Sequence, residues 1–104
     1  MLLAIDTSAG TAVAVVADDG RVLAERSTDD TRRHAEVIGP FLESVLHADG
    51  VSAAALTGVV TGIGPGPYTG LRVGIAAARA VAFVRGIPLL PVPSHDAVAL
   101  ALVE

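Results

Sequence analysis

Two short, uninterrupted apolar runs near the N-terminus, Leu2–Ile5 and Thr11–Ala17, constrain the fold more than any other feature. Apolar runs of this length without polar alternation are typical of strands buried on both faces. Asp18-Asp19-Gly20 follows, and an Asp-Gly pair favours the positive φ angles of a type I′ hairpin turn. Arg21–Ser27 carries charged side chains, which favours a position at the edge of the sheet. We therefore expect three antiparallel strands at the start of the domain.

The rest of the chain shows helical and strand patterns in turn. The expected bounds are, in order, a helix over 35–47, a strand over 56–63, a helix over 69–84, a strand over 88–92 and a helix over 94–102. Pro40 lies inside the first helical pattern, so it should kink that helix or mark a late start. The order β-β-β-α-β-α-β-α fits an α/β lobe, residues 1–104, with helices on the faces of a mixed sheet. It resembles the ribonuclease H-like fold of the actin/Hsp70/sugar-kinase superfamily.

The composition limits both the core and the chemistry. Hydrophobic residues make up 52% of the chain but aromatic ones only 3%, so Ala, Val, Leu and Ile must fill the core and bring backbones close together. Every basic residue is an arginine, which excludes a Walker-type phosphate lysine and a Schiff-base lysine in this chain. The lack of cysteine excludes a thiolate nucleophile and a cysteine zinc site. A net charge of −4 argues against a dedicated nucleic-acid surface.

The expected compartment is the cytoplasm. Met1 leads directly into an apolar run without a basic segment, which does not fit a secretory signal peptide. The apolar stretch Val73–Val84 is too short to span a bilayer and contains Arg79. We therefore expect no membrane contact.

The most specific segment is the glycine- and proline-rich run Gly64–Gly74. A loop of this kind between a strand and a helix directs backbone N–H groups toward whatever lies over the helix N-terminus. Gly64, Gly66 and Thr69 are the candidate anion-binding residues, and Thr69 is also a suitable cap for the helix. The residues alone support an anion site and a well-capped turn equally.

Two further polar segments have a functional and a structural interpretation. In nucleotide-binding members of the superfamily, an acid at the end of the first strand holds a metal ion, which makes Asp6, Thr7 and Ser8 a candidate nucleotide loop. An aspartate before Thr or Ser also forms an Asx-turn, and we favour this role. His34 and Glu36 could form a functional pair, but an acid in the first turn of a helix is expected from the helix dipole alone.

Small residues form a stripe along the second predicted helix. Gly70, Gly74 and Ala78 recur at intervals of four residues, so another helix or a sheet can approach closely there. The stripe can face this domain's own sheet or a partner protein, and the periodicity leaves both open.

The segments Asp6-Thr7-Ser8, His34-Ala35-Glu36 and Gly64–Gly74 together resemble, in order and spacing, the TsaB/YeaZ family. The similarity extends over nearly the whole chain, although Pro67 and Tyr68 stand where serine and phenylalanine are expected. It implies the N-terminal half of a normally two-lobed, non-catalytic accessory protein. Such proteins support the threonylcarbamoyladenosine (t6A) modification of tRNA at position 37.

The resemblance also implies partners. Catalysis is expected in the paralogue TsaD, the ATPase TsaE joins through the TsaB–TsaD complex, and tRNA is contacted only indirectly. A homodimer is expected when TsaD is absent. The family packs its first two helices against the partner, which makes interface candidates of Val37, Phe41, Val45, Gly70, Gly74 and Ala78. No metal or cofactor is expected, and ATP or ADP only at the interface with partners.

Three rival classes share the fold. TsaD has the Gly-Pro-Gly loop but binds its metal through a His-x-x-x-His pair, and an ungapped alignment puts Ser94 and Val98 at those positions. Neither residue can replace an imidazole, and His95 is displaced by one position. A metallopeptidase-like enzyme is disfavoured for the same reason. The alternative of a nucleotide phosphotransferase is supported by Asp6 and the glycine-rich loop.

Overall fold

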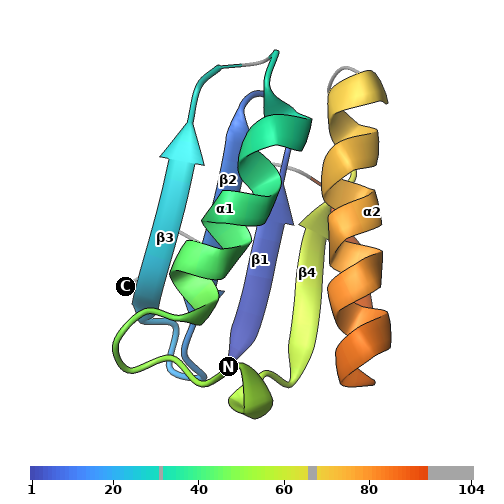
Figure 1. The fold of residues 1–104 in the computed structure, drawn as a ribbon. Coiled ribbons are helices and arrows are strands. Elements are labelled where there is room, and N and C mark those ends of the chain that lie inside the picture. Colours follow the sequence, from blue (N-terminus) through green and yellow to red (C-terminus); the bar gives the residue numbers. More distant parts are fainter. Residues whose placement is uncertain (31, 66–67, 94–104) are drawn as a thin grey trace.

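The computed structural model describes residues 1–30, 32–65 and 68–93. The elements are, in order, β1 (Leu2–Asp6), β2 (Thr11–Val16), β3 (Val22–Thr28), α1 (His34–Leu46), a 3-10 turn (Ala53–Ala55), β4 (Gly58–Gly62), α2 (Tyr68–Arg85) and β5 (Leu89–Val92). The five strands form one sheet in the order β3-β2-β1-β4-β5. Both α1 and α2 lie against the same face of this sheet (Figure 1). The helix predicted over 94–102 lies outside the described residues.

The sheet is mixed, as the sequence predicts. β1 pairs antiparallel with β2, and β2 pairs antiparallel with β3. β4 lies parallel to both β1 and β5. The arrangement therefore confirms the expected α/β sheet and its three antiparallel opening strands.

The turn between β2 and β3 differs from the prediction. Gly20 has a φ of 90°, but among the described residues only glycines have positive φ values. A type I′ turn needs two successive positive values, so that prediction is wrong. Instead, the Gly20 amide donates to the Ala17 carbonyl at 2.9 Å, and the Ala17 amide donates to the Arg21 carbonyl at 2.8 Å. A loop with one left-handed glycine leaves Asp19 unstrained.

The helix boundaries differ from the predictions by one residue. α1 begins at His34 and contains Pro40, which faces outward, where water can serve the carbonyl group that a proline leaves unpaired. Pro40 therefore marks neither the start nor the end of α1. α2 begins at Tyr68, so Thr69 lies inside the first turn and is not the cap.

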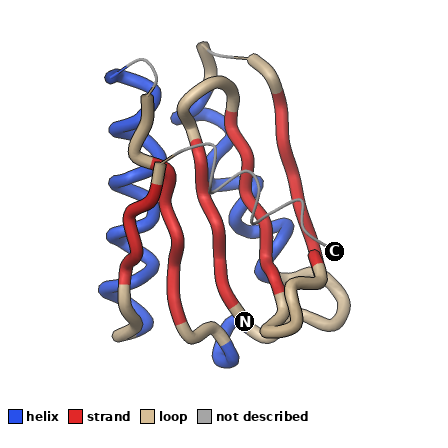
Figure 2. The backbone as a smooth tube through the Cα atoms, turned by 180° about the vertical axis from the view of Figure 1, so that it is seen from behind, coloured by secondary structure: helices blue, strands red, loops and turns tan. Residues whose placement is uncertain are grey.

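The main core lies between the helices and the sheet. It consists of Leu3, Ile5, Val13, Val15, Val45, Leu56, Val59, Ala78 and Ala82. A smaller apolar cluster on the opposite face contains Ala4 and Val60 (Figure 2 views the sheet from that side). Alternate residues of β1 thus enter different clusters, which confirms that this strand is buried on both faces. Neither described helix is long and apolar enough to cross a membrane.

Candidate functional site

Several of the predicted site residues meet where β1 ends. Asp6 closes β1, and Thr7 and Ser8 follow it directly. The first residue of α1, His34, and the first turns of α2 lie against this point. The structure therefore brings the Asp6 turn, His34 and the glycine stripe of α2 together, although they are far apart in the sequence.

Asp6 organises the turn after β1. Its Oδ1 accepts hydrogen bonds from the Ser8 amide at 2.7 Å and from the Ser8 hydroxyl at 2.6 Å. This is the Asx-turn that we favoured from the sequence. Asp6 is only 6% exposed, and its second oxygen, Oδ2, has no hydrogen-bond partner among the described residues.

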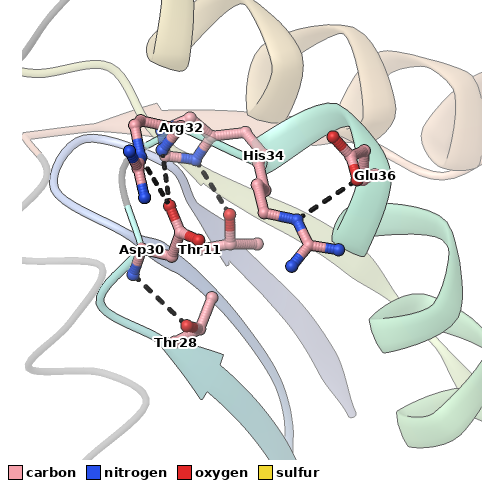
Figure 3. Close-up of polar contacts among 7 residues, drawn as sticks. Thr11, Thr28, Asp30, Arg32, His34 and Glu36 are labelled. Atoms are coloured by element: carbon pink, nitrogen blue, oxygen red, sulfur yellow. Dashed lines mark hydrogen bonds and ion pairs between the residues drawn. The ribbon is translucent and has the colours of Figure 1, made fainter.

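His34 has a structural partner that the sequence did not indicate. Its Nδ1 lies 2.8 Å from the hydroxyl oxygen of Thr11, the first residue of β2, and both residues are buried (Figure 3). Glu36 is exposed and accepts a hydrogen bond from Nε of Arg33 at 3.2 Å (Figure 3). His34 and Glu36 therefore form no pair, which agrees with the structural interpretation. Thr11 belongs to an apolar strand pattern, which gives no sign that its hydroxyl meets a histidine from another element.

The small-residue stripe of α2 faces its own domain. Ala78 is 0% exposed and lies in the main core. A Cβ atom at Gly70 would lie 2.9 Å from Nε2 of His34, and one at Gly74 would lie 2.5 Å from Oγ1 of Thr7. This settles the orientation that the periodicity left open. In this arrangement the three residues serve internal packing, and a partner could reach Ala78 only if α2 moved.

The apolar stripe of α1 is mostly turned inward as well. Val45 is 0% exposed, while Val37 and Phe41 are half-buried. Phe41 packs against the main core. Of the six interface candidates, only Val37 and Phe41 are thus partly accessible, because a helix that covers a sheet directs its apolar face toward that sheet.

The outer faces of the two helices form a different surface. It consists of Glu36, Gly39, Pro40 and Glu43 of α1, of His47 directly after α1, and of Arg72, Ala76, Arg79, Ala80 and Phe83 of α2. A shallow hollow on α1 is lined by Gly39, Pro40, Glu43, Ser44 and His47. Phe83 is 87% exposed, an unusual position for a large aromatic side chain. We call these ten exposed residues the outer helix face.

The candidate nucleotide loop fits a phosphate group poorly. The Ser8 amide and hydroxyl donate to Asp6, and the Thr7 hydroxyl bonds to the backbone of α2. These three groups are thus used within the domain rather than left for a phosphate. Gly64 is buried with a φ of 114°, Thr69 is exposed, and Gly66 lies outside the described residues.

Metal ligands are also not gathered in the described part of the chain. Within it, no three His, Asp or Glu side chains are close enough to hold a metal ion. Ser94 and Val98, aligned with the TsaD metal ligands, lie outside the described residues, as does His95.

The strand order and the helices on the sheet define the class, a lobe of the ribonuclease H-like fold found in the actin-like superfamily. The chain belongs to the family described as "TsaD: tRNA N6-adenosine threonylcarbamoyltransferase", whose family model matches residues 21–104. Within this fold it is similar to YeaZ from Pseudomonas aeruginosa, with a TM-score of 0.77 and 32% identity over 88% of this chain and 44% of that one. The resemblance to TsaB/YeaZ is thereby confirmed.

Two relatives show the range of the similarity. An uncharacterised protein of Mycobacterium tuberculosis is 46% identical over 99 residues, which cover 93% of this chain and 47% of the relative. A tRNA N6-adenosine threonylcarbamoyltransferase of Streptococcus suis is 36% identical over 108 residues, which cover 88% of this chain and 32% of the relative. The chain therefore spans about half the length of the first and about a third of the second.

Proposed function

We propose that this chain is the N-terminal lobe of a non-catalytic accessory subunit that supports threonylcarbamoylation of tRNA by a TsaD partner. The observation that carries the proposal is the similarity of the fold to YeaZ over most of the chain. The family also includes transferases, so the choice between the two roles depends on the site. Here the polar groups after β1 are used to hold the domain together, which favours a supporting role.

A nucleotide phosphotransferase is the second candidate. One observation favours it, the buried Oδ2 of Asp6 without a described partner. Against it stands the use of the Thr7 and Ser8 donors within the domain. We therefore assign ATP or ADP, if bound, to the interface with partners rather than to this turn.

The proposed partner surface is the outer helix face. It contains an exposed aromatic residue, Phe83 on α2, and a hollow on α1, and exposed large apolar side chains are typical of protein contact sites. The half-buried Val37 and Phe41 border it on α1. TsaD is the proposed main partner, TsaE joins through that complex in the cytoplasm, and tRNA is contacted only indirectly.

The charges on this surface are divided between the helices. The exposed acids of α1 are Glu36 and Glu43. α2 contains three arginines and no acid. A two-fold axis that places α1 of one copy against α2 of another would bring opposite charges together twice. This supports the proposed homodimer in the absence of TsaD.

A reconstituted modification reaction tests the accessory role. Full-length protein, TsaD and TsaE from one organism are mixed with threonylcarbamoyl-adenylate and unmodified tRNA, and t6A is measured by mass spectrometry of nucleosides. We expect formation of t6A to require both TsaD and this protein, and no product with this protein alone. Product without TsaD would contradict the non-catalytic role. Full activity without this protein would contradict the supporting role.

A further inference from the structure

The hydroxyl group of Thr7 lies between two backbone groups of α2. Thr7 follows β1 directly and is 1% exposed. Its hydroxyl donates a hydrogen bond to the Gly70 carbonyl and accepts one from the Gly74 amide at 3.1 Å. These two backbone groups are four residues apart, and an uninterrupted α-helix pairs such groups with each other. The side chain of Thr7 thus takes part in the hydrogen-bond ladder of α2.

This approach depends on glycine at both helical positions. A Cβ atom at Gly74 would lie 2.5 Å from the Thr7 hydroxyl oxygen. A Cβ atom at Gly70 would lie 2.9 Å from the Thr7 carbonyl oxygen. Heavy atoms of side chains do not approach this closely, so any other residue would push α2 away from the end of β1.

The start of α1 is fixed at the same place. The buried ring of His34 bonds to Thr11 of β2 through Nδ1, and its Nε2 occupies the space where a Gly70 side chain would be. One polar cluster, formed by Thr7, Thr11, His34, Gly70 and Gly74, therefore holds the first turns of both helices against the sheet.

The other ends of the helices are held differently. There Val45 of α1 and Ala82 of α2 enter the apolar core. Apolar packing is not directional, whereas hydrogen bonds have strict distances and angles. The polar cluster is thus the part of the contact that can fix where each helix lies along the sheet.

We infer that Thr7 is a positioning residue, whose hydroxyl sets the place of α2 beside α1 and thereby the shape of the outer helix face. This inference rests on the proposed function, because the outer helix face is the proposed partner surface. Thr7 touches neither the partner nor a substrate in this role. It acts through the backbone of α2.

Three substitutions separate the hydroxyl from the rest of the side chain. Thr7→Val keeps the branched shape but puts a methyl group where the hydroxyl meets the Gly70 carbonyl and the Gly74 amide. Carbon needs a longer contact to oxygen than a hydrogen bond does, so α2 must move away. The Gly70 carbonyl and the Gly74 amide can then pair with each other alone, which limits the loss of stability. Thr7→Ser keeps the hydroxyl and is the matched control, and Thr7→Ala removes it without added bulk.

The test measures helix placement and partner affinity in the full-length protein. Nuclear Overhauser contacts between the His34 ring and the Gly70 α protons report the position of α2, and calorimetric titration with TsaD reports affinity. We expect Thr7→Val to weaken these contacts and to lower affinity about tenfold, with Thr7→Ser close to the wild type. Should Thr7→Val not fold, Thr7→Ala provides the same comparison.

Two results would overturn the inference. One is a variant without the hydroxyl in which α2 keeps its place and TsaD its affinity. The other is equal damage from Thr7→Ser, since this would assign the effect to the lost methyl group. If the wild type itself does not bind TsaD, the proposed function fails, while the contacts between His34 and Gly70 still decide whether Thr7 positions α2.

Discussion

The hydroxyl oxygen of Thr7 lies 3.1 Å from the backbone nitrogen of Gly74, although 67 residues separate the two in the sequence. This contact explains the glycine in the middle of α2, where glycine is otherwise unfavourable by about 1 kcal/mol relative to alanine. Glycine lowers the intrinsic stability of the helix at this position, but it allows α2 to approach the end of β1 closely. The small-residue stripe thus serves the inner packing of the lobe.

The first prediction concerns this glycine. Gly74→Ala places a Cβ atom 2.5 Å from the Thr7 hydroxyl oxygen and should destabilise the protein, since overpacking costs about 1–3 kcal/mol and outweighs the gain in helix propensity. Gly39 of α1 is the control for the contact between elements, because a Cβ atom there would meet no atom of another element within 4 Å. Gly39→Ala should change stability little, because Pro40 disfavours a Cβ atom on the helical residue before it and this opposes the gain in helix propensity. Urea unfolding measures both.

A second substitution checks the cause of the effect. Thr7→Ala in the Gly74→Ala background removes the clashing hydroxyl and should recover part of the lost stability, so that the two changes are not additive. If Gly74→Ala were tolerated as well as Gly39→Ala, the contact between Thr7 and α2 would be refuted.

The second prediction concerns Asp6. In Asp6→Asn the side-chain carbonyl can still accept both hydrogen bonds from Ser8, and the new amide group takes the place of Oδ2, which has no described partner. We expect a loss on the order of 1 kcal/mol. Asp6→Ala leaves the Ser8 amide without its acceptor and should cost about 1–3 kcal/mol. Neither change should affect nucleotide binding. Loss of ATP affinity at unchanged stability, measured by calorimetry, would instead favour the phosphotransferase.

The third prediction compares two alanines on opposite sides of α2. Ala78 is 0% exposed, so Ala78→Glu buries a charge in the core and should cost more than about 4 kcal/mol, enough to unfold much of the protein. Ala76 lies on the outer helix face. Ala76→Glu should change stability by less than about 0.5 kcal/mol but weaken TsaD binding. Circular dichroism and calorimetry distinguish these results, and a folded Ala78→Glu protein would contradict the inward orientation of the stripe.

Much of the sheet could be predicted from the sequence because buried strands need continuous apolar runs, and Leu2–Ile5 and Thr11–Ala17 provide them. The Asx-turn at Asp6 was equally predictable, since it involves residues two positions apart. Local chemistry also predicted the positive φ angle of Gly20 in the turn before β3. It did not predict the φ angle of Asp19, because the turn type depends on how the two strands join.

The contacts between elements could not be predicted in the same way. The stripe of Gly70, Gly74 and Ala78 indicates close approach, but a helical period does not say which neighbour approaches. The link from His34 to Thr11 joins residues from two elements whose spacing depends on the assembled sheet. The outer helix face could not be predicted from the apolar pattern of the helices, because apolar positions are the ones that face the sheet.

The last prediction tests the proposed homodimer. Glu43 on α1 and Arg79 on α2 are exposed and carry opposite charges. In a two-fold dimer that sets α1 against α2, each charge of one copy faces the opposite charge of the other. Glu43→Arg and Arg79→Glu should each weaken the dimer about tenfold, because each brings like charges together. The double variant restores attraction in both places and should dimerise as the wild type does.

Analytical ultracentrifugation at low and at high salt measures the dimer dissociation constants, and high salt should reduce the differences between the variants. Phe83→Ser is the control for the apolar part of the interface, and it should weaken the dimerisation of every variant to the same extent. A double variant that dimerises no better than either single one would show that α1 and α2 do not face each other across the axis.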